Sequence, residues 1–180
     1  MAVPSSGRGR DRRTVNAFRL LFAIKGATAV VAVLLFSWVG WDVWQRFSVG
    51  DAVVIDGDTL RIEATTFRLV GIDAPELKQT CGVKKRWACG LRAKEALTAL
   101  VRMRAIVCLH RGEDVYGRVL ALCYAGTKDV GELMVAKGLA ITYGDRGHRY
   151  EAVQDRALRS LHGIWRTSFE LPSEYRRKHR

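Results

Sequence analysis

Apolar residues follow two different patterns along this chain. From Leu20 to Trp44 they run almost without a break, and Lys25 and Asp42 are the only charged residues in the stretch. A helix needs about 20 apolar residues to span the hydrocarbon core of a bilayer, so residues 20–44 are predicted to form a transmembrane helix. After residue 51 the apolar residues come in short alternating or helical groups, which predicts a folded domain.

The segment before the apolar run is a basic tail, residues 1–19, rich in Arg, Gly and Ser. A cleaved signal peptide has a similar start, but Ser37–Trp44 offers no small-x-small cleavage site, which favours an uncleaved anchor. Arginines ahead of the helix leave the rest of the chain outside the cytoplasm by the positive-inside rule. We therefore expect the protein to be anchored in the cell inner membrane with its folded body in the periplasm. If the segment is cleaved, the body is expected to be secreted.

The folded body is predicted over residues 52–168. Strand-like runs cover residues 52–55, 59–63, 65–72, 105–109 and 119–124, and helical periods cover residues 91–103, 130–137 and 150–161. Five short strands with a helix between the third and fourth are typical of a five-stranded OB-fold barrel, here a mainly β or α+β fold with about three helices. Another small α+β domain fits the same pattern. Residues 45–51 are assigned to a linker and residues 169–180 to a basic tail.

Charge narrows the choice of partner. The chain has 30 Lys and Arg against 18 Asp and Glu, a formal net charge of +12. The excess extends beyond the tail, because residues 51–180 carry 23 basic and 16 acidic residues. A basic body favours a polyanionic partner such as nucleic acid, although a generally basic secreted protein has the same charge. The membrane is the other expected partner, through residues 20–44, and no protein partner is predicted.

Four cysteines occur in the body, at Cys81, Cys89, Cys108 and Cys123. An even number in an oxidising compartment favours disulfides. If the runs that contain Cys108 and Cys123 pair as neighbouring strands, a bridge between them is geometrically possible, and Cys81 and Cys89 would then staple their loop. Free buried thiols are an alternative. Zinc is a weaker one, because the cysteines lack the paired spacing of zinc sites.

Carboxylates occur in two turn-like motifs. Asp56-Gly-Asp-Thr59 lies between two predicted strands, and Asp73-Ala-Pro-Glu76 follows the third. The proline holds Ala74 extended, so that its carbonyl can face the same site as the Asp73 carboxylate. Two carboxylates, a carbonyl and water form a site for a hard cation, with Ca²⁺ preferred to Zn²⁺. Taken alone, each motif is also explained as a turn or a cap.

Two arginines change this interpretation. Arg118 begins the fifth predicted strand, and Arg68 lies on the strand that leads to Asp73. Guanidinium groups bind phosphate through two parallel hydrogen bonds and stabilise the charge of a phosphoryl transition state, although simple ion pairs also explain them. Arg68 is five residues before Asp73 and therefore on the opposite face of an ideal strand. A bend near Gly71 is required to bring both to one site.

Together the motifs resemble the thermonuclease (staphylococcal nuclease) family in order and approximate spacing. The resemblance covers residues 52–166, nearly the whole predicted body. The family fold is an OB barrel with three helices, as read above. The matching motifs are Asp56-Gly-Asp-Thr59, Phe67-Arg-Leu69, Gly71-Ile-Asp-Ala-Pro-Glu76, Tyr116-Gly-Arg118 and Gly163-Ile-Trp165.

The resemblance implies a Ca²⁺-dependent nuclease that cleaves DNA, RNA or both to a 5′-hydroxyl and a 3′-phosphate. By this match, Asp58, Asp73 and the Ala74 carbonyl bind the cation. Glu76 matches the glutamate that orients or deprotonates the attacking water. Two further matches, Arg68 and Arg118, correspond to the phosphate-binding arginines.

Other residues are weaker candidates for nucleic-acid binding. Tyr116 and Tyr143 could stack on bases, and Lys84 and Lys85 could guide a strand, although a surface role explains each equally well. Val115 stands where several family members carry Lys, so one phosphate contact is expected to be missing.

Two other functions fit the sequence. One is an OB-type module that binds nucleic acid without turnover, and the other is an accessory protein of envelope or exopolysaccharide (succinoglycan-type) biosynthesis with a nuclease-like domain.

Overall fold

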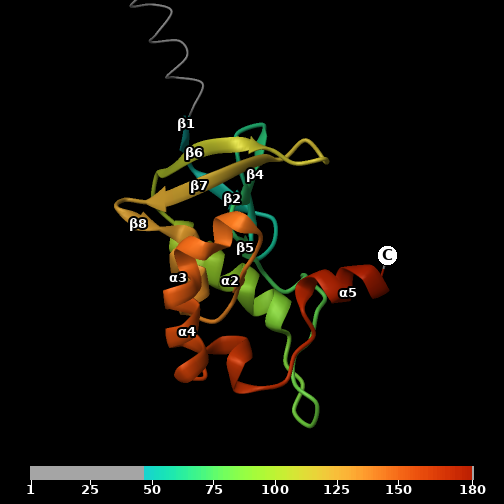
Figure 1. Ribbon diagram of the computed structural model, residues 1–180. Coiled ribbons are helices and arrows are strands. Elements are labelled where there is room, and N and C mark those ends of the chain that lie inside the picture. The colour runs from blue at the N-terminus through green and yellow to red at the C-terminus, as the bar shows by residue number, and fades with distance from the viewer. Residues whose placement is uncertain (1–46, 180) are drawn as a thin grey trace, which may run out of the picture. The chain divides into compact units, whose positions relative to one another are not determined.

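The computed structural model describes residues 47–179, shown in colour in Figure 1. The predicted basic tail, the predicted transmembrane helix and the first two residues of the predicted linker lie outside this range. Within residues 47–179 no helix is long and apolar enough to cross a membrane.

A curled mixed sheet forms the framework of the domain. Its strands, in the order in which they neighbour one another, are β1, β6, β7, β4, β3 and β2, and β8 also pairs with β7. β4 and β7 run parallel, whereas the other pairs are antiparallel. The bounds are β1 Phe47–Gly50, β2 Ala52–Val54, β3 Thr59–Ile62, β4 Thr65–Leu69, β6 Ile106–Glu113, β7 Val119–Ala125 and β8 Lys128–Asp129.

The two edge strands of this sheet, β1 and β2, follow one another in the chain. β1 ends at Gly50 and β2 begins at Ala52, so only Asp51 separates the first strand of the order from the last. Gly50 packs against Ile62 so closely that an added Cβ would lie 2.7 Å from the Ile62 Cγ2. The sheet therefore curls into a half-barrel, in agreement with the predicted OB-like architecture.

Helices cover one end of the half-barrel. Figure 1 shows α2, α3 and α4 gathered there, with α5 set apart from them. The bounds are α2 Cys89–Val101, α3 Val130–Ala136, α4 Glu151–Arg159 and α5 Pro172–Lys178, with 3₁₀ turns η1 Asp145–Tyr150 and η2 Gly163–Arg166. A second, two-stranded sheet pairs β5, Ile72–Asp73, with β9, Ile141–Thr142.

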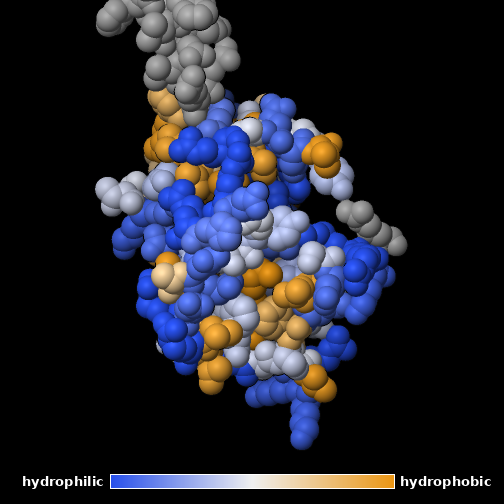
Figure 2. Space-filling model, viewed as in Figure 1, coloured by the Kyte–Doolittle hydropathy of each residue, from blue (hydrophilic) through white to orange (hydrophobic). Residues whose placement is uncertain are grey.

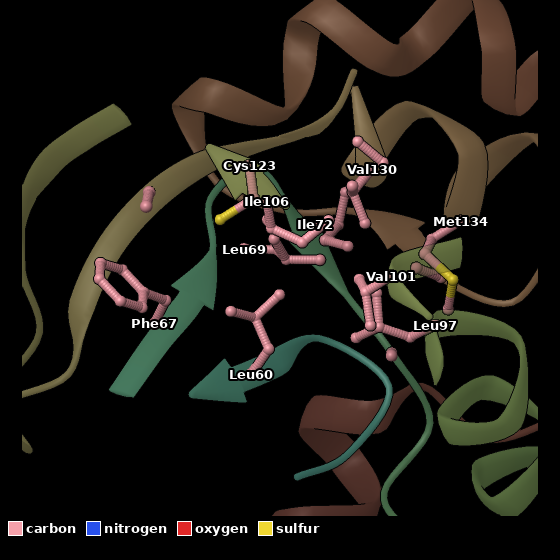
Figure 3. Close-up of a cluster of buried hydrophobic side chains, with 14 of the residues drawn as sticks. Leu60, Phe67, Leu69, Ile72, Leu97, Val101, Ile106, Cys123, Val130 and Met134 are labelled. Carbon is pink, nitrogen blue, oxygen red and sulfur yellow. The ribbon is translucent and has the colours of Figure 1, made fainter. Parts of the chain in front are cut away.

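The core fills the space between the curled sheet and the helices (Figure 3). On β3, Leu60 and Ile62 are buried while Arg61 between them is exposed, as expected for a strand with one face on the core. Phe67 and Leu69 of β4 and Leu97 of α2 complete the same cluster. Burying one such side chain contributes about 1.5–3 kcal/mol, so this cluster fixes the strands that hold the site.

The predicted elements are largely confirmed, apart from the unpredicted two-residue strands β8 and β9 and three larger differences. The five predicted strands correspond to β2, β3, β4, β6 and β7, but the third stops at Leu69 and resumes as β5 after Gly71. The predicted linker contains β1, which pairs with β6, so the folded body begins before Ala52. The predicted tail contains α5, which raises the α-helices within residues 47–179 to four instead of about three.

Both expected disulfides are present. Cys108 and Cys123 face each other across β6 and β7 and are bonded, and Cys81 is bonded to Cys89 at the start of α2. All four cysteines lie within the described residues and none is free, so the free-thiol and zinc alternatives do not apply.

Candidate active site

Asp58, Glu76, Arg68 and Arg118, all singled out above, line one cleft of about 720 Å³. The other carboxylate, Asp73, is buried and ion-paired to Arg68. The residues come from the loop before β3, from β4, from the segment after β5, from the hairpin between β6 and β7, and from α5. The lining residues are Asp56, Gly57, Asp58, Arg68, Ala74, Pro75, Glu76, Asp114, Tyr116, Arg118, Leu120, Tyr143 and Arg176.

Asp58 lies at the end of the loop before β3 and is buried, with 4% of its surface exposed. The Asp56 carboxylate accepts a hydrogen bond from the Asp58 amide, which fixes the turn before β3. The Oδ1 atom of Asp58 accepts from Arg68 at 2.6 Å, and its Oδ2 atom accepts from the Ala74 amide at 3.0 Å. Burial raises the pKa of Asp58 to about 7, with Arg68 opposing the shift. A second cation beside this carboxylate would offset that desolvation.

Arg68 joins the two buried carboxylates. It lies opposite Thr59 in the β3–β4 pair, so the sheet register places its side chain beside Asp58. One guanidinium nitrogen donates to Asp58 and the other to Asp73 Oδ1 at 2.8 Å. Burial lowers the pKa of Arg68, but both carboxylates outweigh that effect and the net shift is upward.

The bend that this geometry requires occurs at Gly71. Its φ of +83° lies in the left-handed region, which side chains other than glycine rarely adopt. After the bend, β5 pairs with β9 and leaves Asp73 with 0% of its surface exposed. The chain reversal therefore turns Asp73 toward Arg68, and the predicted bend is confirmed.

Glu76 follows in a turn that packs against α2. Its amide donates to the side chain of the buried Gln79, and its carbonyl accepts from the Gln79 amide. Gly90, in the first turn of α2, touches the Glu76 carbonyl so closely that an added Cβ would lie 1.7 Å from the oxygen. The backbone of Glu76 is thus held rigidly, while its partly exposed carboxylate faces the cleft.

Arg118 reaches the cleft from the start of β7 and is held by Asp114. The Asp114 carboxylate accepts from the backbone amide of Arg118 and from its Nε atom at 2.7 Å. Desolvation would raise the pKa of Asp114, but these hydrogen bonds lower it. Asp114 was not predicted. The available signal was its spacing, an acidic residue four positions before the arginine.

The weaker candidates divide into two pairs. Tyr116 and Tyr143 line the cleft with 68% and 53% of their surfaces exposed, as base-stacking side chains require. The Arg118 guanidinium lies 5.6 Å from the Tyr116 ring centroid. Lys84 and Lys85 are exposed on the loop between the first two cysteines and do not line the cleft.

Arg176 is a second site residue that the sequence analysis did not indicate. It belongs to α5, yet its guanidinium donates to both oxygens of Asp73, each at 2.9 Å, and to Glu76 at 2.8 Å. The hydrogen bonds to Asp73 raise the pKa of Arg176 despite its burial. Nothing in a short basic segment 100 residues away in sequence predicts this contact.

The donor set fits a hard cation. Asp58 and Asp73 are buried carboxylates joined by Arg68, and the Arg176 guanidinium already holds a positive charge against Asp73. Within residues 47–179 no cluster of three or more His, Cys, Asp or Glu side chains is arranged to hold a metal. The Ala74 amide faces Asp58, and the role of the Ala74 carbonyl stays a prediction.

The curled sheet and the cleft with carboxylates and arginines fit a staphylococcal nuclease-like domain. Sequence comparison gives the same class. Residues 66–167 match the staphylococcal nuclease homologue family. The chain belongs to this family, and its curled sheet with helices fits the OB-like fold expected for it.

Individual relatives differ in the roles that their names describe. The succinoglycan biosynthesis protein ExoI of Rhizobium meliloti (strain 1021) is 37% identical over 128 residues, covering 68% of this chain and 66% of the relative. An uncharacterized endonuclease of Haemophilus influenzae is 31% identical, covering 69% of this chain and 70% of the relative. A micrococcal nuclease of Shigella flexneri is 28% identical over 77% of this chain and 83% of its own.

Proposed function

We propose that this protein is a Ca²⁺-dependent nuclease that hydrolyses phosphodiester bonds of DNA, RNA or both. The observation that carries the proposal is the convergence of Asp58 and Glu76 with Arg68 and Arg118 on one cleft. The buried Asp73 is ion-paired to Arg68 at the same site. Family membership and the names of the relatives support the same activity.

Asp58, Asp73 and the Ala74 carbonyl would hold the cation. When bound, Ca²⁺ would supply Lewis-acid activation of water and neutralise charge on the scissile phosphate. Glu76 would orient the attacking water and accept its proton, because its carboxylate faces the cleft while its backbone is held against Gly90.

The two arginines have different supports and different tasks. Arg68 is fixed between carboxylates at the base of the cleft and would bind a non-bridging phosphate oxygen there. Arg118 is held by Asp114 through Nε, which leaves its terminal nitrogens to bind the phosphate or stabilise the leaving oxygen. Removing one such donor in a comparable site costs about 3 kcal/mol of barrier.

Location outside the cytoplasm is part of the same proposal. Two disulfides in one small domain are typical of an oxidising compartment, which agrees with the topology predicted from residues 1–44. We propose that the apolar segment 20–44 anchors the domain to the inner membrane as an extracytoplasmic enzyme.

The full-length oxidised chain, purified in mild detergent, tests the activity. We expect cleavage of single- and double-stranded DNA or of RNA in Ca²⁺, and none after chelation, with end-group analysis to locate the broken bond. Binding of nucleic acid without cleavage in Ca²⁺ would instead support the non-catalytic OB-type module.

A second candidate follows from the ExoI relative, whose name places it in succinoglycan biosynthesis. An accessory role in exopolysaccharide biosynthesis would use the same domain in a different context. A deletion strain separates the two: normal polysaccharide with lost surface nuclease activity supports the nuclease, and the reverse supports the accessory role.

A further inference from the structure

The carboxyl-terminal segment 168–179, here called the strap, places the guanidinium of Arg176 against the carboxylates of Asp73 and Glu76. The Arg176 guanidinium donates to Asp73 Oδ1 and Oδ2 and to Glu76 Oε1. Arg68 donates to Asp73 Oδ1 as well. Three hydrogen bonds therefore engage both oxygens of Asp73, and one arginine side chain covers a proposed cation ligand together with the proposed base.

The base of the strap is firmly attached. The Ser168 carbonyl accepts from the Gly82 amide, and the Glu170 carbonyl accepts from the buried Gln79 side chain at 2.7 Å. Phe169 packs edge-on against Trp165, beside the buried pair Cys81–Cys89. The disulfide loop and the strap thus form one unit beside the cleft.

The far end of the strap has much less support. α5 has only seven residues, of which Pro172 alone is fully buried, and Figure 2 shows a mostly hydrophilic surface over it. An isolated helix shorter than about 12 residues is marginal in water. Pro172 is the buried residue of α5, so the position of this helix depends on ion pairs: those of Arg176 to Asp73 and Glu76, and one from Lys178 to Glu170 within the strap.

A hard cation and Arg176 need the same oxygen atoms. Ca²⁺ binds carboxylate oxygens at about 2.3–2.6 Å, and a guanidinium hydrogen-bonded to both oxygens of Asp73 occupies those directions. The two positive charges would also repel one another at this distance. Arg68 lies on a strand and donates to only one oxygen of Asp73, Oδ1. Arg176 lies on a short helix that can move away from the cleft.

We propose that the strap is a built-in competitor of the catalytic cation: Arg176 holds Asp73 and Glu76 until Ca²⁺ displaces it. Binding of Ca²⁺ and docking of the strap exclude each other, so each weakens the other by the same factor. This inference rests on the proposed function, because it takes Asp73 as a cation ligand and Glu76 as the base.

Calorimetric titration of the full-length chain with Ca²⁺ tests the competition without relying on turnover. We expect Arg176→Gln to bind Ca²⁺ about tenfold more tightly than the unmodified chain, because it removes a coupling of the usual size. Arg177→Gln is the matched control, since it removes the same charge from an exposed neighbour on α5 and should leave the affinity unchanged. Arg176→Lys keeps the charge but lacks the planar fork that pairs with a carboxylate, so it should fall between the unmodified chain and Arg176→Gln.

Hydrogen exchange of strap peptides gives the second readout. Ca²⁺ should speed exchange over residues 168–179 in the unmodified chain, and Arg176→Gln should exchange rapidly without Ca²⁺. Ca²⁺ binding that is equal or weaker in Arg176→Gln, with a strap that Ca²⁺ leaves protected, would overturn the competition while leaving the proposed function intact. Absence of both Ca²⁺ binding and cleavage in every variant would overturn the two together.

Discussion

Two regions of the molecule place an arginine against the same buried carboxylate, Asp73, but the secondary structure that supports each arginine is very different. Arg68 comes from β4, whose register with β3 is fixed by core residues on its neighbouring positions. Arg176 comes from a seven-residue helix at the end of the chain, which buries little. The hydrogen-bond lengths are nearly the same, 2.8 and 2.9 Å. The supporting structure, more than the contact itself, separates a permanent partner from a displaceable one.

Removing the permanent partner should have the largest effect. Arg68→Ala leaves Asp58 and Asp73 buried without their shared guanidinium, so we expect about 3 kcal/mol lower stability. We expect kcat/KM for DNA to fall by about a thousandfold. Urea unfolding and initial cleavage rates measure the two effects. Arg61→Ala, on the solvent face of β3, is the control. An Arg68→Ala protein with activity within tenfold of this control would show that Arg68 is not a permanent partner that the site requires.

The disulfides sharpen the comparison, because one lies in the sheet and the other holds the strap. Replacing either pair with serine should lower stability by about 2–4 kcal/mol. Only Cys81→Ser/Cys89→Ser should also speed hydrogen exchange over residues 168–179, since Cys81 and Cys89 pack beside the base of the strap. The matched control is Cys108→Ser/Cys123→Ser, within the paired β6 and β7. Equal effects of the two changes on the strap would contradict this division.

Asp114 tests whether Arg118 also depends on its support. Asp114→Asn weakens the hydrogen bond to Arg118 Nε without emptying the site, so we expect kcat/KM to fall about tenfold through misplacement. The loss of stability should stay below about 1 kcal/mol, because the pair is only partly buried. The neighbouring exposed Glu113→Gln should behave like the unmodified protein. Steady-state kinetics on single-stranded DNA would detect the difference, and an unchanged rate would show that Arg118 orients itself.

The smallest effect is expected outside the cleft. Lys84→Ala/Lys85→Ala removes two exposed charges that do not line the cleft, so kcat/KM should change by less than about twofold near 0.15 M salt, where such charges are screened. Cleavage rates measured from low to high salt provide the check. A tenfold loss that persists at high salt would mean that the cysteine loop contacts the substrate directly.

Sequence alone predicted the sheet half of this comparison and missed the strap. The runs 59–63 and 65–72 predicted the strands that carry Leu60 and Phe67, and Gly71 marked the bend that Arg68 and Asp73 require. The cysteine-bearing runs indicated both disulfides.

The missed elements lack such local signals. β1 has only four residues and is defined by pairing with β6, a contact across more than 50 residues. α5 reads as a basic tail, because its docking is due to one ion-pair cluster and to the disulfide loop and not to an apolar face. Gln79 donates to the Glu170 carbonyl across 91 residues, a contact that only the folded chain creates.

Glu76 is where the account can be tested most directly, since it faces the cleft, is proposed as the base, and is also held by Arg176. The measurement is single-turnover DNA cleavage in Ca²⁺ over a range of protein concentrations, which separates the cleavage rate constant from the apparent affinity. For Glu76→Gln we predict a rate constant about a thousandfold lower with nearly unchanged affinity, against Glu95→Gln on α2 as control. A Glu76→Gln protein that cleaves DNA as fast as the control would contradict the assignment of this cleft as the active site.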